Sequence, residues 1–102
     1  MLQSVKTVFL LVVVLTVSQL FADGDVDHQE VRRLTQSGKI LPLTELLRSV
    51  QENRPGRVIE VELERKGRLY LYEIEILDDQ GVVWEYKLDA VTGDILELEV
   101  ED

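Results

Sequence analysis

Apart from carboxylates, the chain contains few side chains that could carry chemistry. It has 102 residues, a single histidine, His28, and no cysteine. Hydrolysis by a nucleophile and a base needs a serine or cysteine beside a histidine that a carboxylate orients. His28 is expected at the exposed start of a helix, and Ser37 and Ser49 lie in ordinary polar stretches. We therefore predict that the protein is not an enzyme and has no catalytic residue.

The same residues argue against a bound metal or cofactor. One histidine without any thiolate cannot form a zinc site of the usual kind. Asp78-Asp79-Gln80 resembles the start of a calcium loop, but the acids at alternate positions and the closing glutamate of such a loop are missing. Aspartates are common in turns, so we interpret Asp78 and Asp79 as turn-forming residues. The prediction is no metal site and no cofactor.

The charge balance limits the partners that the protein can bind. The chain has 11 basic and 20 acidic residues, and Lys6 is the only charged residue among the first 22. Residues 23–102 therefore carry 10 basic and 20 acidic residues, a net charge of −10. Such a field repels phosphate backbones and anionic lipid, which excludes a nucleic-acid binder or a membrane-surface protein. A hydrophobic content of 45% is too high for a disordered acidic tail.

The first 22 residues have the pattern of a secretory signal peptide. Lys6 precedes the uncharged run TVFLLVVVLTV, which is followed by Ser18 and a small residue, Ala22. A membrane-spanning helix needs about 18 or more apolar residues, and this run is shorter. The alternative is an uncleaved anchor over residues 7–22. We expect cleavage after Ala22, a periplasmic or secreted protein without a stable membrane anchor, and one domain over residues 23–102.

The exported part begins with two helical patterns. After a polar leader, Asp27 can cap a short helix that ends before Gly38, and Glu30 completes a capping box. The second pattern, from Leu43 to Asn53, places four apolar residues on one helix face: Leu43, Leu46, Leu47 and Val50. Pro42 suits the start of this helix and Arg54-Pro55-Gly56 ends it.

From Arg57 the period of the apolar residues changes to two, which predicts four strands joined by short turns. Lys66-Gly67 is expected to form a hairpin loop, and Gly93 a turn that requires a positive φ. Four sets of residues are expected to face the core: Ile59, Val61 and Leu63; Tyr70, Tyr72, Ile74 and Ile76; Val82, Trp84, Tyr86 and Leu88; and Leu96, Leu98 and Val100. Short loops require antiparallel pairing, and only the helices can cover the apolar face. The predicted fold is therefore α+β, with two N-terminal helices on one face of a four-stranded antiparallel meander.

Two stretches of the chain resemble a PepSY domain. The first begins at Leu47 and reads LRSVQENRPGRVIEVELE, and the second, YEIEIL followed by WEYKLDAVTGDIL, is similar to the last strands of that family. The Asp-Ala-x-Thr-Gly turn after an aromatic strand is the most specific part, and the likeness covers residues 43–100. The resemblance implies an exported, non-enzymatic binding module related to peptidase propeptides, whose partner is a protein or peptide such as a peptidase.

The open face of the sheet is the predicted binding surface. Its candidate residues are Glu60, Glu62, Leu71, Glu73, Glu75, Val83, Glu85 and Lys87. Leu71 and Val83 are expected to form its apolar centre. The expected mechanism is occlusion of a peptidase by this face, or addition of an edge strand to the partner's sheet, by a monomer. Two alternatives stay open: a sensor of divalent cations or cationic peptides, and an acidic face that only keeps the protein soluble.

Overall fold

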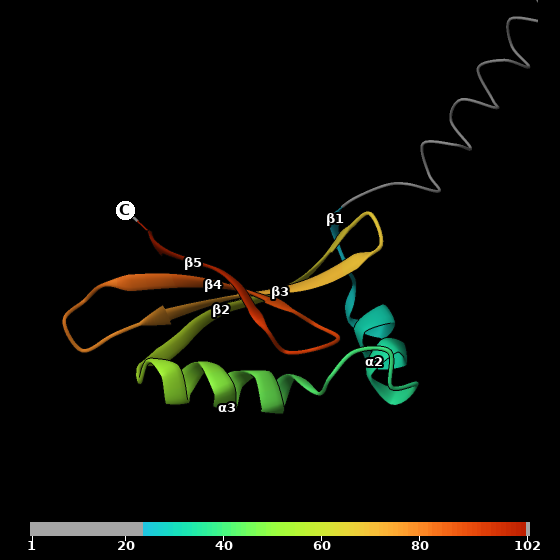
Figure 1. Ribbon diagram of the computed structural model, residues 1–102, viewed down its shortest axis with the longest axis horizontal. Coiled ribbons are helices and arrows are strands. Elements are labelled where there is room, and N and C mark those ends of the chain that lie inside the picture. The colour runs from blue at the N-terminus through green and yellow to red at the C-terminus, as the bar shows by residue number, and fades with distance from the viewer. Residues whose placement is uncertain (1–23, 102) are drawn as a thin grey trace, which may run out of the picture.

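The computed structural model describes residues 24–101, which form two helices and one five-stranded antiparallel sheet (Figure 1). In chain order the elements are β1 (Gly24–Asp25), α2 (His28–Gln36), α3 (Leu43–Asn53), β2 (Arg57–Lys66), β3 (Leu69–Leu77), β4 (Val83–Asp89) and β5 (Ile95–Glu101). The strands lie in the order β1-β2-β3-β4-β5, and each pair is antiparallel. The α+β class and the meander are confirmed. The predicted signal peptide lies outside the described residues, among which no helix is long and apolar enough to cross a membrane.

The prediction of four strands is wrong by one, because part of the expected polar leader forms β1. Gly24 pairs with Arg65 and Asp25 with Glu64, and the amide of Val26 donates to the carbonyl of Leu63 at 2.8 Å. Two residues are too few to show an alternating pattern. This strand forms because the free edge of β2 offers backbone partners.

The two helices begin as the sequence predicts. The carboxylate of Asp27 caps α2 by accepting from the amide of Glu30 at 2.9 Å. The reciprocal half of the capping box is replaced by an ion pair between Glu30 and Arg33. Helix α3 occupies the predicted residues and buries Leu46 and Val50.

The core lies between the helices and one face of the sheet (Figure 1). Its buried residues are Leu34, Ile40, Leu46, Val50, Leu63, Tyr72, Ile74, Ile76, Tyr86, Leu88 and Ala90. The inward face predicted for β3 is confirmed for Tyr72, Ile74 and Ile76. Tyr86, predicted to face the core, is fully buried, and its hydroxyl donates to the Asn53 side chain at 2.6 Å, which fixes the end of α3 on the sheet.

Three details of the sheet differ from the predictions. The first hairpin turns at Gly67-Arg68, one residue later than expected, because Lys66 still pairs with Leu69. Ile59 is 43% exposed, because the register of β2 shifts between Val58 and Glu60 and leaves Ile59 as the unpaired residue of a bulge.

The third difference concerns β5, whose apolar side chains are exposed instead of buried. Leu96, Leu98 and Val100 are 54%, 40% and 48% exposed, although the sequence predicts that they face the core. A shift of register between Lys87 and Leu88 leaves Leu96 unpaired in a second bulge. Leu98 and Val100 keep the inward direction of their cross-strand partners but do not belong to the buried core. The apolar side chains of β5 therefore stay at least 40% exposed.

Candidate functional site

The open face of the sheet carries two rows of charged side chains that run across β2 to β5. One row contains Glu62, Glu73, Lys87 and Glu97, and the next contains Glu60, Glu75, Glu85 and Glu99. Directly paired residues of antiparallel strands point to the same face, so each row brings its side chains close together. The structure thus places the six charged candidates, Glu60, Glu62, Glu73, Glu75, Glu85 and Lys87, on one surface.

The two glutamates at the centre of these rows are held partly protonated near neutral pH. Glu73 shares a hydrogen bond with Glu64, and this bond, burial and the charge of Glu85 raise the pKa of Glu73 to about 8. A hydrogen bond with Glu101, burial and the nearby Glu60 raise the pKa of Glu75 to about 7. Glu75 is only 9% exposed, so its expected exposure to water is wrong. It is buried because it lies on the central strand between two glutamates, Glu60 and Glu85.

Lys87 is the one basic residue among the charged side chains of these two rows. Its Nζ lies 3.6 Å from a carboxylate oxygen of Glu97. Burial lowers the pKa of Lys87, but the charges of Glu97, Glu73 and Glu85 outweigh burial and raise it. Even with Glu73 and Glu75 partly protonated, one ammonium group cannot neutralise the other glutamates of the two rows, so the face attracts cations.

Two groups of carboxylates on this side of the sheet are close enough to hold a cation. Oxygen atoms of Glu73, Glu75 and Glu85 lie within 4.8 Å of one another, and so do oxygen atoms of Asp25, Glu62 and Glu64. Carboxylate oxygens are the ligands that Ca²⁺ prefers. However, exposed acidic groups often cluster in this way without an ion. This geometry therefore permits binding of a cation without requiring it.

The predicted apolar centre of the open face is only partly present. Leu71 is 7% exposed, since it lies on the central strand between its cross-strand partners Glu64 and Asp89. It cannot offer an exposed apolar contact as expected. Val83 is half-buried at the far end of the sheet and pairs with Leu77 and Glu101. The open face is therefore a charged surface without an apolar centre.

A second polar arrangement, which the sequence reasoning did not identify, surrounds Trp84. The guanidinium of Arg54 stacks 3.6 Å from the centre of the indole ring, and the indole Nε1–H donates to Asp78 at 2.9 Å. Asp78 also accepts from the amides of Gln80 and Val82. Hydrogen bonds, first from Trp84 and then from the Val82 amide, lower the pKa of Asp78. The turn-forming role predicted for Asp78 is thus confirmed.

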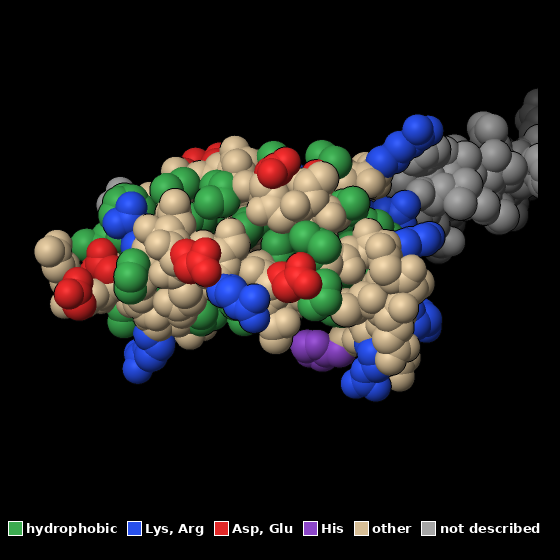
Figure 2. Space-filling view, turned by 60° about the horizontal axis from the view of Figure 1, so that its bottom comes forward, with side chains coloured by type: hydrophobic (Ala, Val, Ile, Leu, Met, Phe, Trp, Pro, Cys, Tyr) green, Lys and Arg blue, Asp and Glu red, His purple; other side chains and the backbone are tan. Residues whose placement is uncertain are grey.

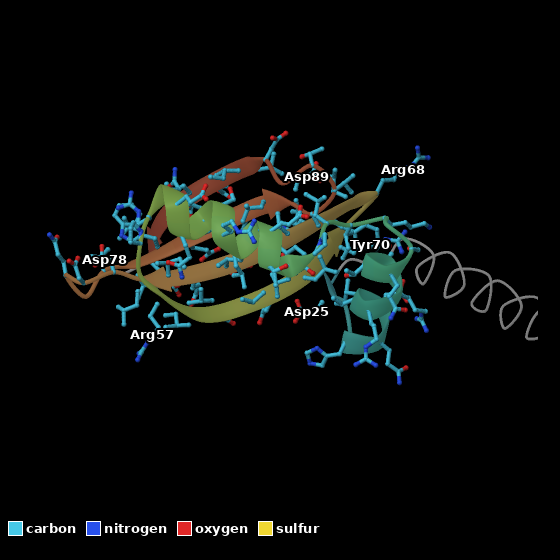
Figure 3. All side chains as sticks on the ribbon, turned by 90° about the horizontal axis from the view of Figure 1, so that it is seen from below. Asp25, Arg57, Arg68, Tyr70, Asp78 and Asp89 are labelled. Carbon is cyan, nitrogen blue, oxygen red and sulfur yellow. The ribbon has the colours of Figure 1, made fainter. Side chains whose placement is uncertain are left out.

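Trp84 and its neighbours also line an open pocket of 500 Å³. The pocket lies at the end of the sheet where Asp78 and Arg57 are found, whereas Arg68, Tyr70 and Asp89 lie toward the other end (Figure 3). In the sequence Arg54 only precedes the proline that follows α3, and nothing there indicates its contact with the Trp84 ring. The lining contains no histidine, cysteine or serine, so the pocket has no hydroxyl or thiol nucleophile with an imidazole base.

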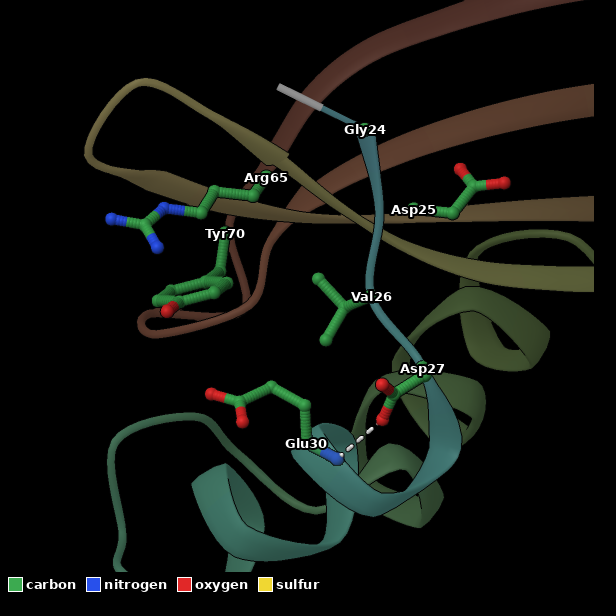
Figure 4. A pocket seen from close by; sticks show the side chains of 7 residues that line it. All are labelled: Gly24, Asp25, Val26, Asp27, Glu30, Arg65 and Tyr70. Atoms are coloured by element: carbon green, nitrogen blue, oxygen red, sulfur yellow. Dashed lines mark hydrogen bonds between the residues drawn. The ribbon is translucent and has the colours of Figure 1, made fainter. Parts of the chain in front are cut away.

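Two smaller pockets lie near the β1 strand, at the other end of the sheet. The first, of 320 Å³, lies between Tyr70, Glu30 and Asp27, with the guanidinium of Arg65 5.7 Å from the Tyr70 ring (Figure 4). The second, of 370 Å³, is lined mainly by apolar side chains and by Tyr72, whose buried hydroxyl finds no hydrogen-bond partner among the described residues. Burial raises the pKa of Tyr72.

None of the residues weighed as nucleophile or base forms a catalytic arrangement in the described part of the chain. His28 is exposed at the first position of α2. The hydroxyl of Ser37 donates to the backbone carbonyl of Leu34, and Ser49 is exposed on α3. The arrangement of the described residues supports binding by charge and shape, and it offers no activated nucleophile.

The comparisons with known proteins agree with the resemblance seen in the sequence. The family model of the PepSY domain, described as "Peptidase propeptide and YPEB domain", matches residues 40–99. The matched residues include α3 and β2 to β4 entirely, and most of β5. Neither a curated protein nor a solved structure matches the chain.

Proposed function

Because this chain belongs to the PepSY family, we propose that it is a non-enzymatic binding module that inhibits or modulates a peptidase. The family match carries this proposal, since it covers nearly the whole α3–sheet unit and describes peptidase propeptides. A propeptide acts by binding its peptidase. A PepSY unit that acts on a separate peptidase needs only a surface that fits the enzyme.

The electrostatics of the open face support a partner with a basic surface. The glutamates of the two rows lie side by side, and directly opposed like charges cost roughly 0.2–1 kcal/mol per pair. A partner that brings lysine or arginine side chains to Glu73 and Glu85 would remove part of this repulsion. The repulsion in the free protein is thus a source of favourable binding free energy.

We also propose that the protein works in the periplasm or outside the cell as a monomer. Residues 1–22 have the pattern of a signal peptide, and PepSY domains occur in exported proteins. Intact-mass measurement of the protein recovered from the culture medium or periplasm tests this proposal. A mass equal to that of residues 23–102 supports cleavage after Ala22, and the mass of the full-length chain overturns it.

The proposed inhibition is tested by titrating the purified chain against a panel of secreted zinc metallopeptidases. We expect the activity of at least one peptidase to fall to a plateau at a stoichiometric ratio while the chain stays intact. Degradation of the chain as an ordinary substrate, or full activity of every peptidase, would overturn the proposal. The double variant Glu73→Lys/Glu85→Lys should inhibit at least about tenfold more weakly. Glu52→Lys, a charge reversal on the exposed side of α3, is the matched control.

The second candidate function is that of a sensor for divalent cations or cationic peptides, and the cluster of Glu73, Glu75 and Glu85 favours it. Binding of Ca²⁺ would raise the melting temperature in proportion to the logarithm of its concentration. Glu75→Gln should abolish that rise, whereas Glu52→Gln should leave it unchanged. A rise that is equal for Ca²⁺ and for NaCl of the same ionic strength would show screening of the glutamates, not a site.

A further inference from the structure

The edge strand β5 combines an uncovered apolar side with a row of glutamates on its other side. Among the described residues, seven large apolar side chains are exposed, and four of them belong to β5: Ile95, Leu96, Leu98 and Val100. None of the four belongs to the buried core, and each is at least 40% exposed. Figure 2 shows exposed apolar side chains on the helix-bearing side of the molecule, the side toward which Leu98 and Val100 point.

The backbone of β5 is free to pair because this strand ends the sheet. Within residues 24–101 the order of strands is β1-β2-β3-β4-β5, so β5 is paired with β4 alone and no described strand lies along its other edge (Figure 1). An exposed edge strand with apolar side chains is a template for a further strand. An extended peptide that adds there gains backbone hydrogen bonds, and its alternate side chains meet the two faces of the sheet.

The charges of β5 determine which strand can be added. Glu97, Glu99 and Glu101 all point to the open face, because they are the cross-strand partners of Lys87, Glu85 and Val83. Side chains of an added antiparallel strand that point to that face would stand directly opposite these glutamates. Lysine or arginine is favoured at those positions, and apolar residues are favoured at the alternate positions, which face Leu98 and Val100.

A second copy of the chain does not meet this requirement. Two copies joined antiparallel through β5 about a twofold axis would share one open face. Their six glutamates would then oppose one another along the new interface, at a cost in each directly opposed pair. The bulge at Leu96 further disturbs a regular pairing of two copies.

We infer that β5 is a docking edge for an extended segment of another protein in which basic and apolar residues alternate. This inference rests on the proposed binding function and names the edge and the chemistry of the partner. It places recognition on the rim of the sheet, with the apolar contacts on the helix side and the ion pairs on the open face. The edge supplies the exposed apolar contact that Leu71 fails to supply.

The inference is tested with a short peptide that alternates Lys and Val, labelled for fluorescence anisotropy. We expect the chain to bind this peptide and to bind neither a peptide alternating Glu and Val nor one with the same lysines and valines in two blocks. Alternate amides of a strand point to opposite edges, so two N-methylated peptides serve as probes. In one probe the methyl groups point toward β5, and in the other they point away from it. Addition as a strand requires that one probe loses binding and that the other keeps it.

Charge-neutral variants locate the site. Leu98→Ser should weaken binding about tenfold, since the lost apolar contact is of that order. Ile59→Ser is the matched control, because the exposed fractions of the two side chains are similar, 43% for Ile59 and 40% for Leu98. Ile59 lies on β2, which is separated from β5 by two strands. Val100→Ser repeats the test should Leu98→Ser unfold the protein. Equal effects of the Ile59 and Leu98 changes, equal binding of the block peptide, or no binding at all would overturn the inference.

Two further measurements separate this inference from the proposed function. Self-association that Leu98→Ser abolishes would show that a second copy occupies the edge and would overturn the inference. Peptidase inhibition that survives Leu98→Ser unchanged would leave the proposed function standing and remove β5 from it. Binding of the Lys/Val peptide without inhibition of any peptidase would support the edge and overturn inhibition.

Discussion

Replacing Glu75 with glutamine should stabilise the protein, and the gain should grow as the pH rises. The carboxyl of Glu75 has a pKa of about 7 in the folded chain, because it shares a hydrogen bond with Glu101, is buried, and lies near Glu60. In the unfolded chain the ordinary value is 4.5. Between these values the folded state binds more protons than the unfolded state, so the free energy of unfolding falls as the pH rises. The stabilising effect of protonating Glu75 is complete below pH 4.5 and is lost above about pH 7.

The size of the effect follows from the difference between the two pKa values. Each unit corresponds to about 1.4 kcal/mol, which sets an upper limit of about 3 kcal/mol for Glu75. Its partners Glu60 and Glu101 are exposed, so solvent screening reduces the effect to about 1–2 kcal/mol. Glutamine keeps the size of the side chain and can donate to Glu101, but it never acquires a charge. For a domain of this size 1 kcal/mol shifts the melting temperature by about 4–8 °C.

The assay is urea or thermal unfolding of the wild type and the variant between about pH 4.5 and pH 8.5. We expect equal stability at the acidic end and a more stable Glu75→Gln at the alkaline end, with the difference reduced by salt. Glu52→Gln on α3 removes the same charge away from the sheet and is the control. A wild type whose stability rises between about pH 5 and pH 8, or a Glu75→Gln variant that gains nothing at about pH 8.5, would refute the reasoning.

Three further predictions concern stability and are checked by urea unfolding. Asp27→Ala removes the cap of α2 and should cost about 1 kcal/mol, with Asp27→Asn close to wild type. Asp78→Ala removes the acceptor of the Trp84 indole and of two backbone amides and should cost about 2–3 kcal/mol of stability. It should also change the tryptophan fluorescence, and an unchanged emission spectrum would contradict the hydrogen bond to the indole. Gly56→Ala should cost about 1–3 kcal/mol, because the added Cβ would lie 2.6 Å from the carbonyl oxygen of Leu77, and a neutral effect would show that the turn can shift.

The sequence predicts the faces of the central strands because alternation survives wherever the pairing is regular. Tyr72 and Ile74 face the core and Glu73 faces away, as a period of two requires. Alternation fails at a bulge, where one additional residue changes the face of its neighbours. Nothing in the sequence around Ile59 or Leu96 distinguishes a bulged strand from a regular one, so alternation predicts that both side chains face the core.

The exposure of β5 does not follow from its sequence pattern, for a geometric reason. A helix with its side chains is about 10–12 Å wide, whereas neighbouring strands lie about 4.8 Å apart, so one helix covers two or three strands. Helix α3 and the short α2 therefore cannot cover all five strands of the described sheet. An amphipathic strand indicates that its apolar side is suited to burial, but it does not show whether the same chain or another one covers that side. The sequence alone thus placed Leu98 and Val100 in the core with the same pattern that here leaves them exposed.

The open face and the β5 edge are coupled, because Glu99 and Glu101 belong to both. Glu99 is the cross-strand partner of Glu85, and Glu101 shares a hydrogen bond with Glu75. A basic side chain placed opposite Glu101 would compete for that hydrogen bond and would favour the charged form of the carboxylates around it. Docking at the edge would therefore release protons from the carboxyl groups around Glu75 near neutral pH. By linkage, the affinity for a basic strand would rise with pH over the range in which Glu75 titrates. A glutamate that destabilises the free protein would in this way strengthen its binding to a partner.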